Sequence, residues 1–198
     1  WRQALCLATS TECPERVDDG TMVLAVVASK EGFQWKMAMM FLSSIREAGK
    51  NTLSAYGAAI SCSPDWQQAL QILDMLQVAR LQANYIIFSA AIGTSAKSAA
   101  WRVSMLLLEE VTSLRLQGVG AVGAAVHACE RASEWQAALF LVKNLHCNPG
   151  DIDLQAINSA ITACEKGQQR SVALSLFQEV AAPDIVTYTA LLSCLGSS

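Results

Sequence analysis

The sequence predicts an all-α fold, a right-handed α-solenoid of stacked helical hairpins of about 34 residues each. Three observations lead to this prediction. A pattern led by tryptophan recurs at nearly constant spacing, an apolar pattern precedes each copy, and a short charged turn joins the two. Both patterns have the spacing of one face of an α-helix, so each unit contains two helices.

The tryptophan pattern predicts the second helix of each hairpin. All five tryptophans open a copy, at positions 1, 35, 66, 101 and 135, and Arg170 continues the series. A small residue follows three places later and a long apolar residue at the fourth, as in EWQAALFLV at 134–142. The small residue lets another helix approach closely. We therefore expect four of the tryptophans to be structural core residues and not a ladder on which bases stack, namely Trp35, Trp66, Trp101 and Trp135.

The upstream pattern predicts the first helix of each hairpin, again with a seam of small residues. Its copies are LAVVAS (24–29), YGAAIS (56–61), FSAAIG (88–93), VGAAVHAC (122–129), INSAITAC (157–164) and YTALLSC (188–194). The turns EKGQQ and KEGFQ place a glycine where a helix C-terminus often has one. The loops NPGDID and AAPDIV carry Pro and Asp, which suit a helix stop and restart.

The repeat divides one continuous segment, 1–198, into hairpins. The expected parts are a half repeat at 1–18, hairpins at 19–52, 53–84, 85–118, 119–153 and 154–184, and a half repeat at 185–198. Because the pattern begins and ends within a hairpin, we expect this segment to be part of a longer chain.

Composition and motifs argue against several other functions. The chain is 53% hydrophobic with a net charge of −3, which is an ordered composition without a basic excess. No apolar run reaches the ~18 residues of a membrane span. The seven cysteines are scattered and there are only two histidines, so we expect reduced thiols, no metal and no cofactor. No catalytic motif such as G-x-S-x-G or H-E-x-x-H occurs, so we expect neither an enzyme nor a small-molecule substrate.

Two stretches resemble the pentatricopeptide repeat. They are DIVTYTALLS at 184–193 and ITACEKGQQRSVALSLFQEVAAPD at 161–184, and the match is strongest over 119–198. The ACEKG…W-x-x-AL variant resembles repeats of algal members. Tetratricopeptide repeats have the same period but carry W-x2-L-G-x2-Y in the first helix, whereas tryptophan here opens the second.

The resemblance implies a protein that binds single-stranded RNA, one base per hairpin, in organellar RNA processing, stability or translation, in a plastid or mitochondrion. In this family the base is read by the fifth position of the first helix and the last position of the repeat, and position two flanks it. The base-reading candidates are Ser89, Asn158 and Thr189 at the fifth position and Asn84, Asp153 and Asp184 at the last. Asn158 with Asp184 is a pair that favours uracil in the family, and Gln155 and Val186 are position-two residues. In other hairpins the base-reading pair is incomplete; at Gly57, for example, the fifth position has no polar side chain.

A series of cations near the end of the first helices adds a second expectation. Stacking would place Lys30, Lys97, Arg131 and Lys166 in a row, where they could contact phosphates. Alternatively, cations at helix C-termini complement the macrodipole, and acidic neighbours such as Glu130 dilute their field. The low charge and high apolar content also leave open a non-catalytic scaffold that holds protein partners in a larger organellar complex.

Overall fold

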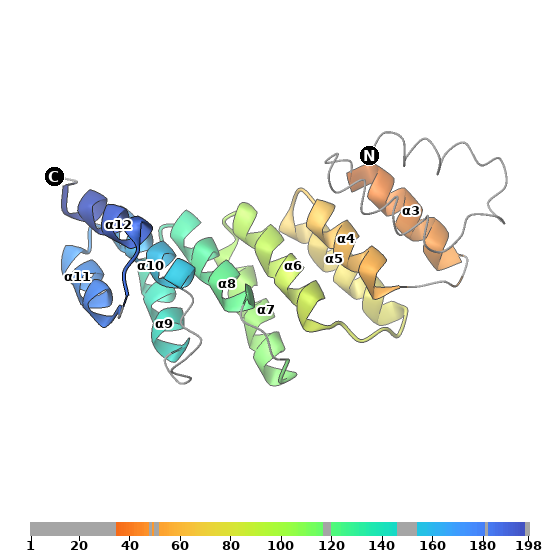
Figure 1. The fold of residues 1–198 in the computed structure, drawn as a ribbon. Coiled ribbons are helices and arrows are strands. Elements are labelled where there is room, and N and C mark those ends of the chain that lie inside the picture. The colour runs from red at the N-terminus through yellow and green to blue at the C-terminus, as the bar shows by residue number, and fades with distance from the viewer. Residues whose placement is uncertain are drawn as a thin grey trace. The chain divides into compact units, whose positions relative to one another are not determined.

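The computed structural model describes residues 35–47, 49, 52–116, 120–145, 154–180 and 182–196, with no side-chain description at 144 and 145. Throughout these residues the regular structure is helical, which confirms the predicted all-α class (Figure 1). The helices are α3 (Trp35–Glu47), α4 (Leu53–Cys62), α5 (Trp66–Val78), α6 (Tyr85–Lys97), α7 (Trp101–Ser113), α8 (Gly120–Arg131), α9 (Trp135–Leu145), α10 (Leu154–Lys166), α11 (Arg170–Glu179) and α12 (Ile185–Gly196). Among them, none combines the length and the apolar character that crossing a membrane would need.

Each described second helix begins at its landmark residue, and the small residue three places later is its closest packing point. These small residues are 0–1% exposed: Ala38, Ala69, Ser104, Ala138 and Ala173. Ser104 satisfies its buried hydroxyl with the hydroxyl of Ser95, at 2.8 Å between the two oxygens. The tryptophans expected in the core, Trp35, Trp66, Trp101 and Trp135, are half-buried. A ring this large in the first helical turn covers the edge of the core and does not sit inside it.

The chain forms two compact units, Trp1–Thr94 and Ser95–Ser198, each considered separately. In the first unit, α4 contacts both α3 and α5. Its core includes the fully buried side chains of Leu42, Tyr56, Ile60 and Leu76. The Thr94 hydroxyl oxygen lies 2.9 Å from the Ala90 carbonyl oxygen of its own helix and 3.1 Å from the Ile60 carbonyl oxygen near the end of α4.

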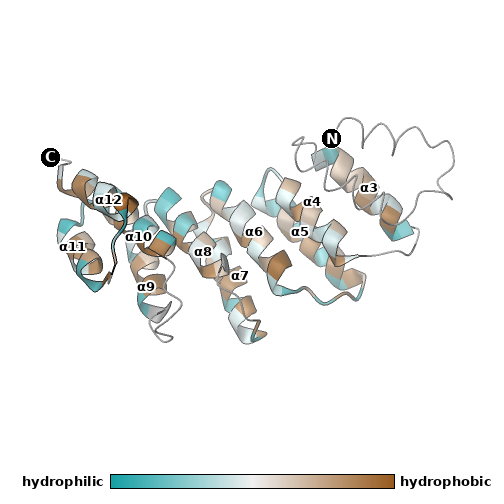
Figure 2. Ribbon diagram, viewed as in Figure 1, coloured by the Kyte–Doolittle hydropathy of each residue, from teal (hydrophilic) through white to brown (hydrophobic). Residues whose placement is uncertain are grey.

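In the second unit, the first helices lie in one row and the second helices in another (Figure 1). Helix α10 contacts both α8 and α12, while α9 contacts α8 and α10, and α11 contacts α10 and α12. Small buried residues line the row of first helices, namely Ala121, Ala125, Ala128, Ala156, Ala160 and Ala163. They let neighbouring backbones approach closely, while polar residues are interspersed between them along the same helices (Figure 2).

In the turn after α3, Gly49 is the left-handed residue, with φ 69°, as expected for a helix C-terminus. In five other described turns the left-handed residue is not glycine but Arg80, Ala99, Arg115, Ser133 or Gln168, with φ between 51° and 61°. The next residue closes the turn on the carbonyl five positions back, as when Gln169 N–H donates to Cys164 O at 2.9 Å. In EKGQQ the expected capping role of glycine is therefore wrong, because Gln168 takes the left-handed conformation and Gly167 precedes it. The glycine of KEGFQ lies outside the described residues.

Gly167 has a packing role instead. A Cβ atom placed on it would lie 3.0 Å from Cγ and 3.2 Å from Nε1 of Trp135, and would also contact Cδ1. Trp135 opens the second helix of the preceding hairpin. The bare glycine therefore allows the indole of one hairpin to pack against the turn of the next.

The described cysteines are buried thiols that form no disulfide, namely Cys62, Cys129, Cys164 and Cys194. Burial raises the pKa of the Cys129 thiol to about 11, with a smaller contribution from Glu134. Burial does the same for Cys164, whose pKa is also about 11, with Cys194 as the second cause. Thiols in this state are small packing residues with little thiolate character. Within the described residues, no group of three His, Cys, Asp or Glu side chains could hold a metal ion.

Candidate nucleic-acid interface

A cleft of about 450 Å³ lies across three successive first helices of the second unit. It is lined by His127 and Glu130 of α8, by Gln155, Asn158, Ser159 and Thr162 of α10, and by Asp184 and Val186 at the start of α12. The structure thus brings together the predicted base-reading residues Asn158 and Asp184. It also places the two position-two residues, Gln155 and Val186, in the wall of the same cleft.

Asn158 carries a buried acceptor without a partner. The residue is 8% exposed, and its Nδ2 donates to Asp184 Oδ1 at 3.4 Å. An ionised carboxylate only accepts hydrogen bonds, so the amide nitrogen must face Asp184 and the amide oxygen must point elsewhere. This Oδ1 atom is buried and finds no hydrogen-bond partner among the described residues. Such an unsatisfied acceptor is rare in proteins, which makes Asn158 a candidate contact for a ligand.

Asp184 is held rigidly because it caps α12. Its Oδ1 accepts hydrogen bonds from the Thr187 hydroxyl and from Thr187 N–H, both at 2.7 Å, and Asp184 N–H donates to the same hydroxyl at 3.3 Å. These bonds lower the pKa of the Asp184 carboxyl, the side-chain bond from Thr187 first. The carboxylate therefore stays ionised at a helix N-terminus, where the dipole also favours a negative charge.

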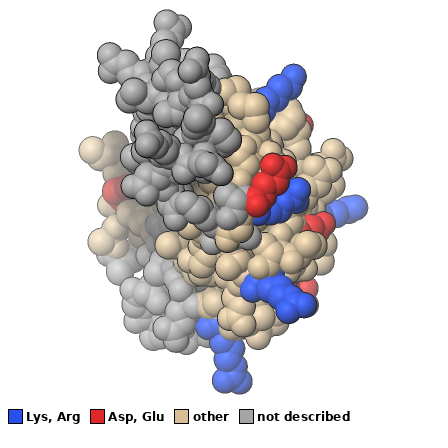
Figure 3. Space-filling model, turned by 90° about the vertical axis from the view of Figure 1, so that its right-hand side faces the viewer, with Lys and Arg blue, Asp and Glu red and all other residues tan. Residues whose placement is uncertain are grey.

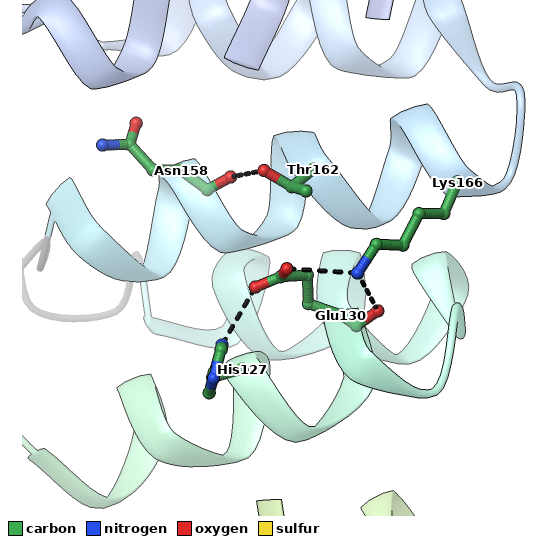
Figure 4. A network of polar contacts seen from close by, with 5 residues as sticks. All are labelled: His127, Glu130, Asn158, Thr162 and Lys166. Atoms are coloured by element: carbon green, nitrogen blue, oxygen red, sulfur yellow. Dashed lines mark hydrogen bonds and ion pairs between the residues drawn. The ribbon is translucent and has the colours of Figure 1, made fainter. Parts of the chain in front are cut away.

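Glu130 links the cleft to the next hairpin (Figure 4). Its Oε2 lies 2.9 Å from His127 Nδ1, and its Oε1 accepts a hydrogen bond from Lys166 Nζ at 3.2 Å. Lys166 Nζ also donates to the Glu130 carbonyl oxygen at 3.1 Å. Partial burial alone would raise the pKa of the Glu130 carboxyl, but the bonds from His127 and Lys166 outweigh it and lower the pKa.

The predicted phosphate-contact cations therefore differ from one another. Lys97 and Arg131 end α6 and α8 and are exposed, whereas Lys166 is ion-paired with Glu130. Lys30 lies outside the described residues. On the face shown in Figure 3, lysine and arginine side chains are interspersed with acidic ones and separated by uncharged surface. The described residues on this face form no continuous field of positive charge.

The first unit has a cleft of about 390 Å³ at the equivalent place between α4 and α6. Its lining includes the predicted residue Asn84, whose Oδ1 accepts a hydrogen bond from Ile87 N–H at 3.1 Å and so caps α6. Gly57 stands where the second unit has Asn158 and contributes no side chain. This cleft therefore has a capping residue at the position of Asp184 but no side chain at the position of Asn158.

The remaining predicted base-reading residues lie elsewhere. Ser89 is half-buried on α6, and Thr189 is exposed on α12, where its hydroxyl donates to Val186 O at 2.8 Å. Neither residue lines one of the two clefts. Asp153 is outside the described residues.

Sequence reasoning did not single out His127, Ser159 and Thr162 as lining residues. Helical spacing could have found two of them. His127 lies one turn before Glu130, and Thr162 lies one turn after Asn158.

The structure is similar to solved structures of the pentatricopeptide repeat protein PPR10. In one, PPR10 is in complex with an 18-nt psaJ RNA element; it gives a TM-score of 0.75 at 16% identity and covers 98% of this chain. A cysteine-to-serine variant of that complex gives the same values. PPR10 from maize gives a TM-score of 0.56 at 15% identity over 97% of this chain.

The chain spans 28% of the PPR10 chain in the RNA complexes and 35% of the maize chain. No protein-family model and no curated protein matches the sequence. At these identities the likeness concerns the fold. The chain therefore has the fold of pentatricopeptide repeat proteins, a right-handed α-solenoid of helical hairpins.

Proposed function

We propose that this chain is a non-catalytic member of the pentatricopeptide repeat family that binds single-stranded RNA, with one base entering the cleft at Asn158. The observation that carries the proposal is the buried, unpartnered Oδ1 of Asn158, a residue that lines the cleft between α8, α10 and the start of α12. A buried acceptor costs stability unless a donor reaches it. A base supplies both the donor and a flat ring to fill the cleft.

The chemistry of the cleft fits an uncharged base. The Asn158 oxygen can accept a hydrogen bond from a ring N–H such as N3–H of uracil, while Asp184 fixes the amide from the other side. Gln155 and Val186 would flank the ring. Two carboxylates, Glu130 and Asp184, line the cleft and oppose entry of a phosphate. The phosphates would instead run outside it, near exposed cations such as Arg131.

Other support comes from the fold and the repeat pattern. PPR10, whose fold this chain shares, was solved with a bound RNA element. We extend the family resemblance to a role in organellar RNA processing, stability or translation, in a plastid or mitochondrion.

Direct binding tests the proposal. Fluorescence anisotropy should show binding to a labelled uracil-rich single strand, weaker binding to an adenine-rich strand and little to a duplex. The affinity should fall as salt rises, because phosphate contacts release counterions. Failure to bind any single strand at low salt would contradict the proposal.

The variant Asn158→Ala tests the cleft itself. We expect it to bind the uracil-rich strand about threefold to tenfold more weakly, as the loss of one hydrogen bond predicts, with a smaller change for the adenine-rich strand. Gln178→Ala is the matched control, because Gln178 is also an amide, is exposed on the second helix α11 and lines neither cleft. Equal losses in the two variants, both with unchanged melting temperatures, would place recognition elsewhere.

A second candidate function is the binding of protein partners. It is favoured by a groove of about 730 Å³ lined mainly by α7 and α9, in which Leu106 is 65% exposed and Phe140 is 58% exposed. Apolar side chains exposed together often mark interaction sites. A photo-reactive residue at position 140 or 159 would separate the functions, because Ser159 lines the cleft and its replacement leaves Asn158 in place. RNA captured from position 159 supports the first, and protein captured reproducibly from position 140 supports the second.

A further inference from the structure

Glu130 is placed where the hairpins of the second unit meet. Its side chain is 16% exposed, and it pairs with His127 on its own helix and with Lys166 on α10. Lys166 is held twice, by the Glu130 carboxylate and by the Glu130 carbonyl near the end of α8. The ammonium is therefore turned toward the preceding hairpin (Figure 4).

We propose that Glu130 sets the charge of the RNA interface by neutralising Lys166 and keeping phosphates out of the Asn158 cleft. The consequence is weaker sequence-independent binding, so that base recognition contributes a larger share of the affinity. This inference rests on the proposed RNA binding and assigns Glu130 as a specificity-determining residue of the same site.

The charges lining the cleft support this role. Glu130 and Asp184 both line it, and no lysine or arginine is among its lining residues. A phosphate in the cleft would meet the Asp184 carboxylate and also the Glu130 carboxylate, whose charge Lys166 balances from outside the lining, while a neutral base would meet no such repulsion. The cleft therefore selects the part of the nucleotide that carries sequence information.

The three described cations of the predicted row show the effect of Glu130. Lys97 and Arg131 are exposed ends of their helices, whereas Lys166 forms an ion pair of zero net charge. Each cation that meets a phosphate strengthens binding without regard to sequence. Pairing Lys166 with Glu130 removes one such contribution at the hairpin that carries Asn158.

A purely structural role would predict the opposite result of a substitution. If Glu130 only ties α8 to α10, its loss loosens the unit and weakens RNA binding. If Glu130 sets the charge, removing the charge leaves Lys166 unneutralised and strengthens binding. The sign of the change in affinity therefore distinguishes the two.

The experiment measures binding of a mixed-sequence single strand over a salt series. Glu130→Gln keeps the shape of the side chain and should bind about threefold more tightly near 100 mM salt, with a salt slope steeper by about 0.7, the values for one added phosphate contact. Because a phosphate could then enter the cleft in place of a base, preference for uracil over adenine should also fall. Glu109→Gln is the matched control, since it changes the net charge equally at an exposed site on α7 and should leave affinity unchanged.

The double variant Glu130→Gln with Lys166→Gln has the net charge of the wild type at this site. It should return affinity and salt slope to within about twofold of the wild type, because the ion pair contributes no net charge. A double variant weaker than the wild type and with a shallower slope would show that Lys166 contacts phosphate, and would overturn the inference even if the single variant did not fold.

The remaining outcomes separate the two proposals. A wild-type chain that binds, with a folded Glu130→Gln variant of equal or lower affinity, overturns the role of Glu130 and leaves the proposed function standing. A wild-type chain and variants that all fail to bind any single strand overturn the proposed function and this inference with it.

Discussion

At the scale of single residues, the absence of a side chain decides how neighbouring hairpins meet. Gly167 is the clearest case, because the Trp135 ring occupies the space where a Cβ would lie. The buried alanines of the second helices act similarly, with Ala138 and Ala173 both 0% exposed. These positions leave room for large neighbours such as Trp135 to pack closely.

Gly167→Ala should lower the free energy of unfolding by about 1–3 kcal/mol, because the added methyl group overpacks the contact with Trp135. Chemical denaturation followed by circular dichroism would measure this change. Gly93→Ala is the matched control, since Gly93 lies inside α6 with nothing within 4 Å of a Cβ atom. There alanine should be neutral or stabilise by up to about 1 kcal/mol. A Gly167→Ala variant as stable as the wild type would show that the ring moves aside at no cost.

At the scale of the element, the turn that ends a helix is determined by its backbone conformation and closing hydrogen bond more than by the type of residue at its left-handed position. Five described turns place a non-glycine residue in the left-handed region, including Ala99 and Gln168. The closing hydrogen bonds recur in the same form, such as Glu134 N–H to Cys129 O at 2.9 Å. Because the motif satisfies several helix-terminal carbonyls at once, it tolerates a residue that is not ideal for its conformation.

Gln168→Gly should stabilise the chain by about 0.5–1 kcal/mol, because glycine avoids the left-handed penalty but has a more flexible unfolded state. Thermal unfolding would show a higher melting temperature. Ala132→Gly supplies the control, since Ala132 precedes the left-handed residue of its own turn and has ordinary φ. That variant should lose about 0.5–1 kcal/mol. Equal effects of the two substitutions would contradict the assignment of strain to Gln168.

At the scale of the whole molecule, burial depends on where a helix stands in the stack of its unit. Helix α10 has neighbours on both sides, and its residue Ile161 is 0% exposed. Leu192 occupies the corresponding place in α12, by the alignment of INSAITAC with YTALLSC, and is 66% exposed. On the side facing α10, by contrast, Leu191 and Cys194 of α12 are buried.

Ile161→Gln should therefore cost about 3–5 kcal/mol, because it places a polar group in a core that lacks a partner for it. Leu192→Gln should change stability by no more than about 0.5 kcal/mol, as expected for an exposed site. Urea denaturation of both variants would measure the difference. Comparable losses in the two would mean that α12 is covered on both faces in solution.

The fold class could be predicted because helical periodicity is a local signal. Apolar residues at i, i+3, i+4 and i+7 define one face within a few turns, and described second helices begin at their landmark residues, as α5 does at Trp66. The turns were harder, because the glycine rule pointed to Gly167 while the left-handed residue is Gln168. A propensity describes an average residue in an average turn and carries no information about the Trp135 ring.

For the candidate site, the positions of Asn158 and Asp184 in the repeat were enough to identify them as base-reading candidates. It could not show that the Asn158 oxygen is left without a partner, or that Lys166 is paired. The Asn158–Asp184 bond joins residues 26 apart, and the Lys166–Glu130 pair joins residues 36 apart. Contacts between residues so far apart in the sequence depend on how one hairpin packs on the next.

The sequence by itself determined that this protein is a stack of helical hairpins, because each helix carries its own apolar face and small-residue seam. Only the tertiary structure decided which polar groups share a cleft, which cation is neutralised and which glycine makes room for an indole. The physical reason is that helix formation follows from spacing within one segment, whereas hydrogen bonds, ion pairs and steric contacts depend on atoms brought together from different hairpins.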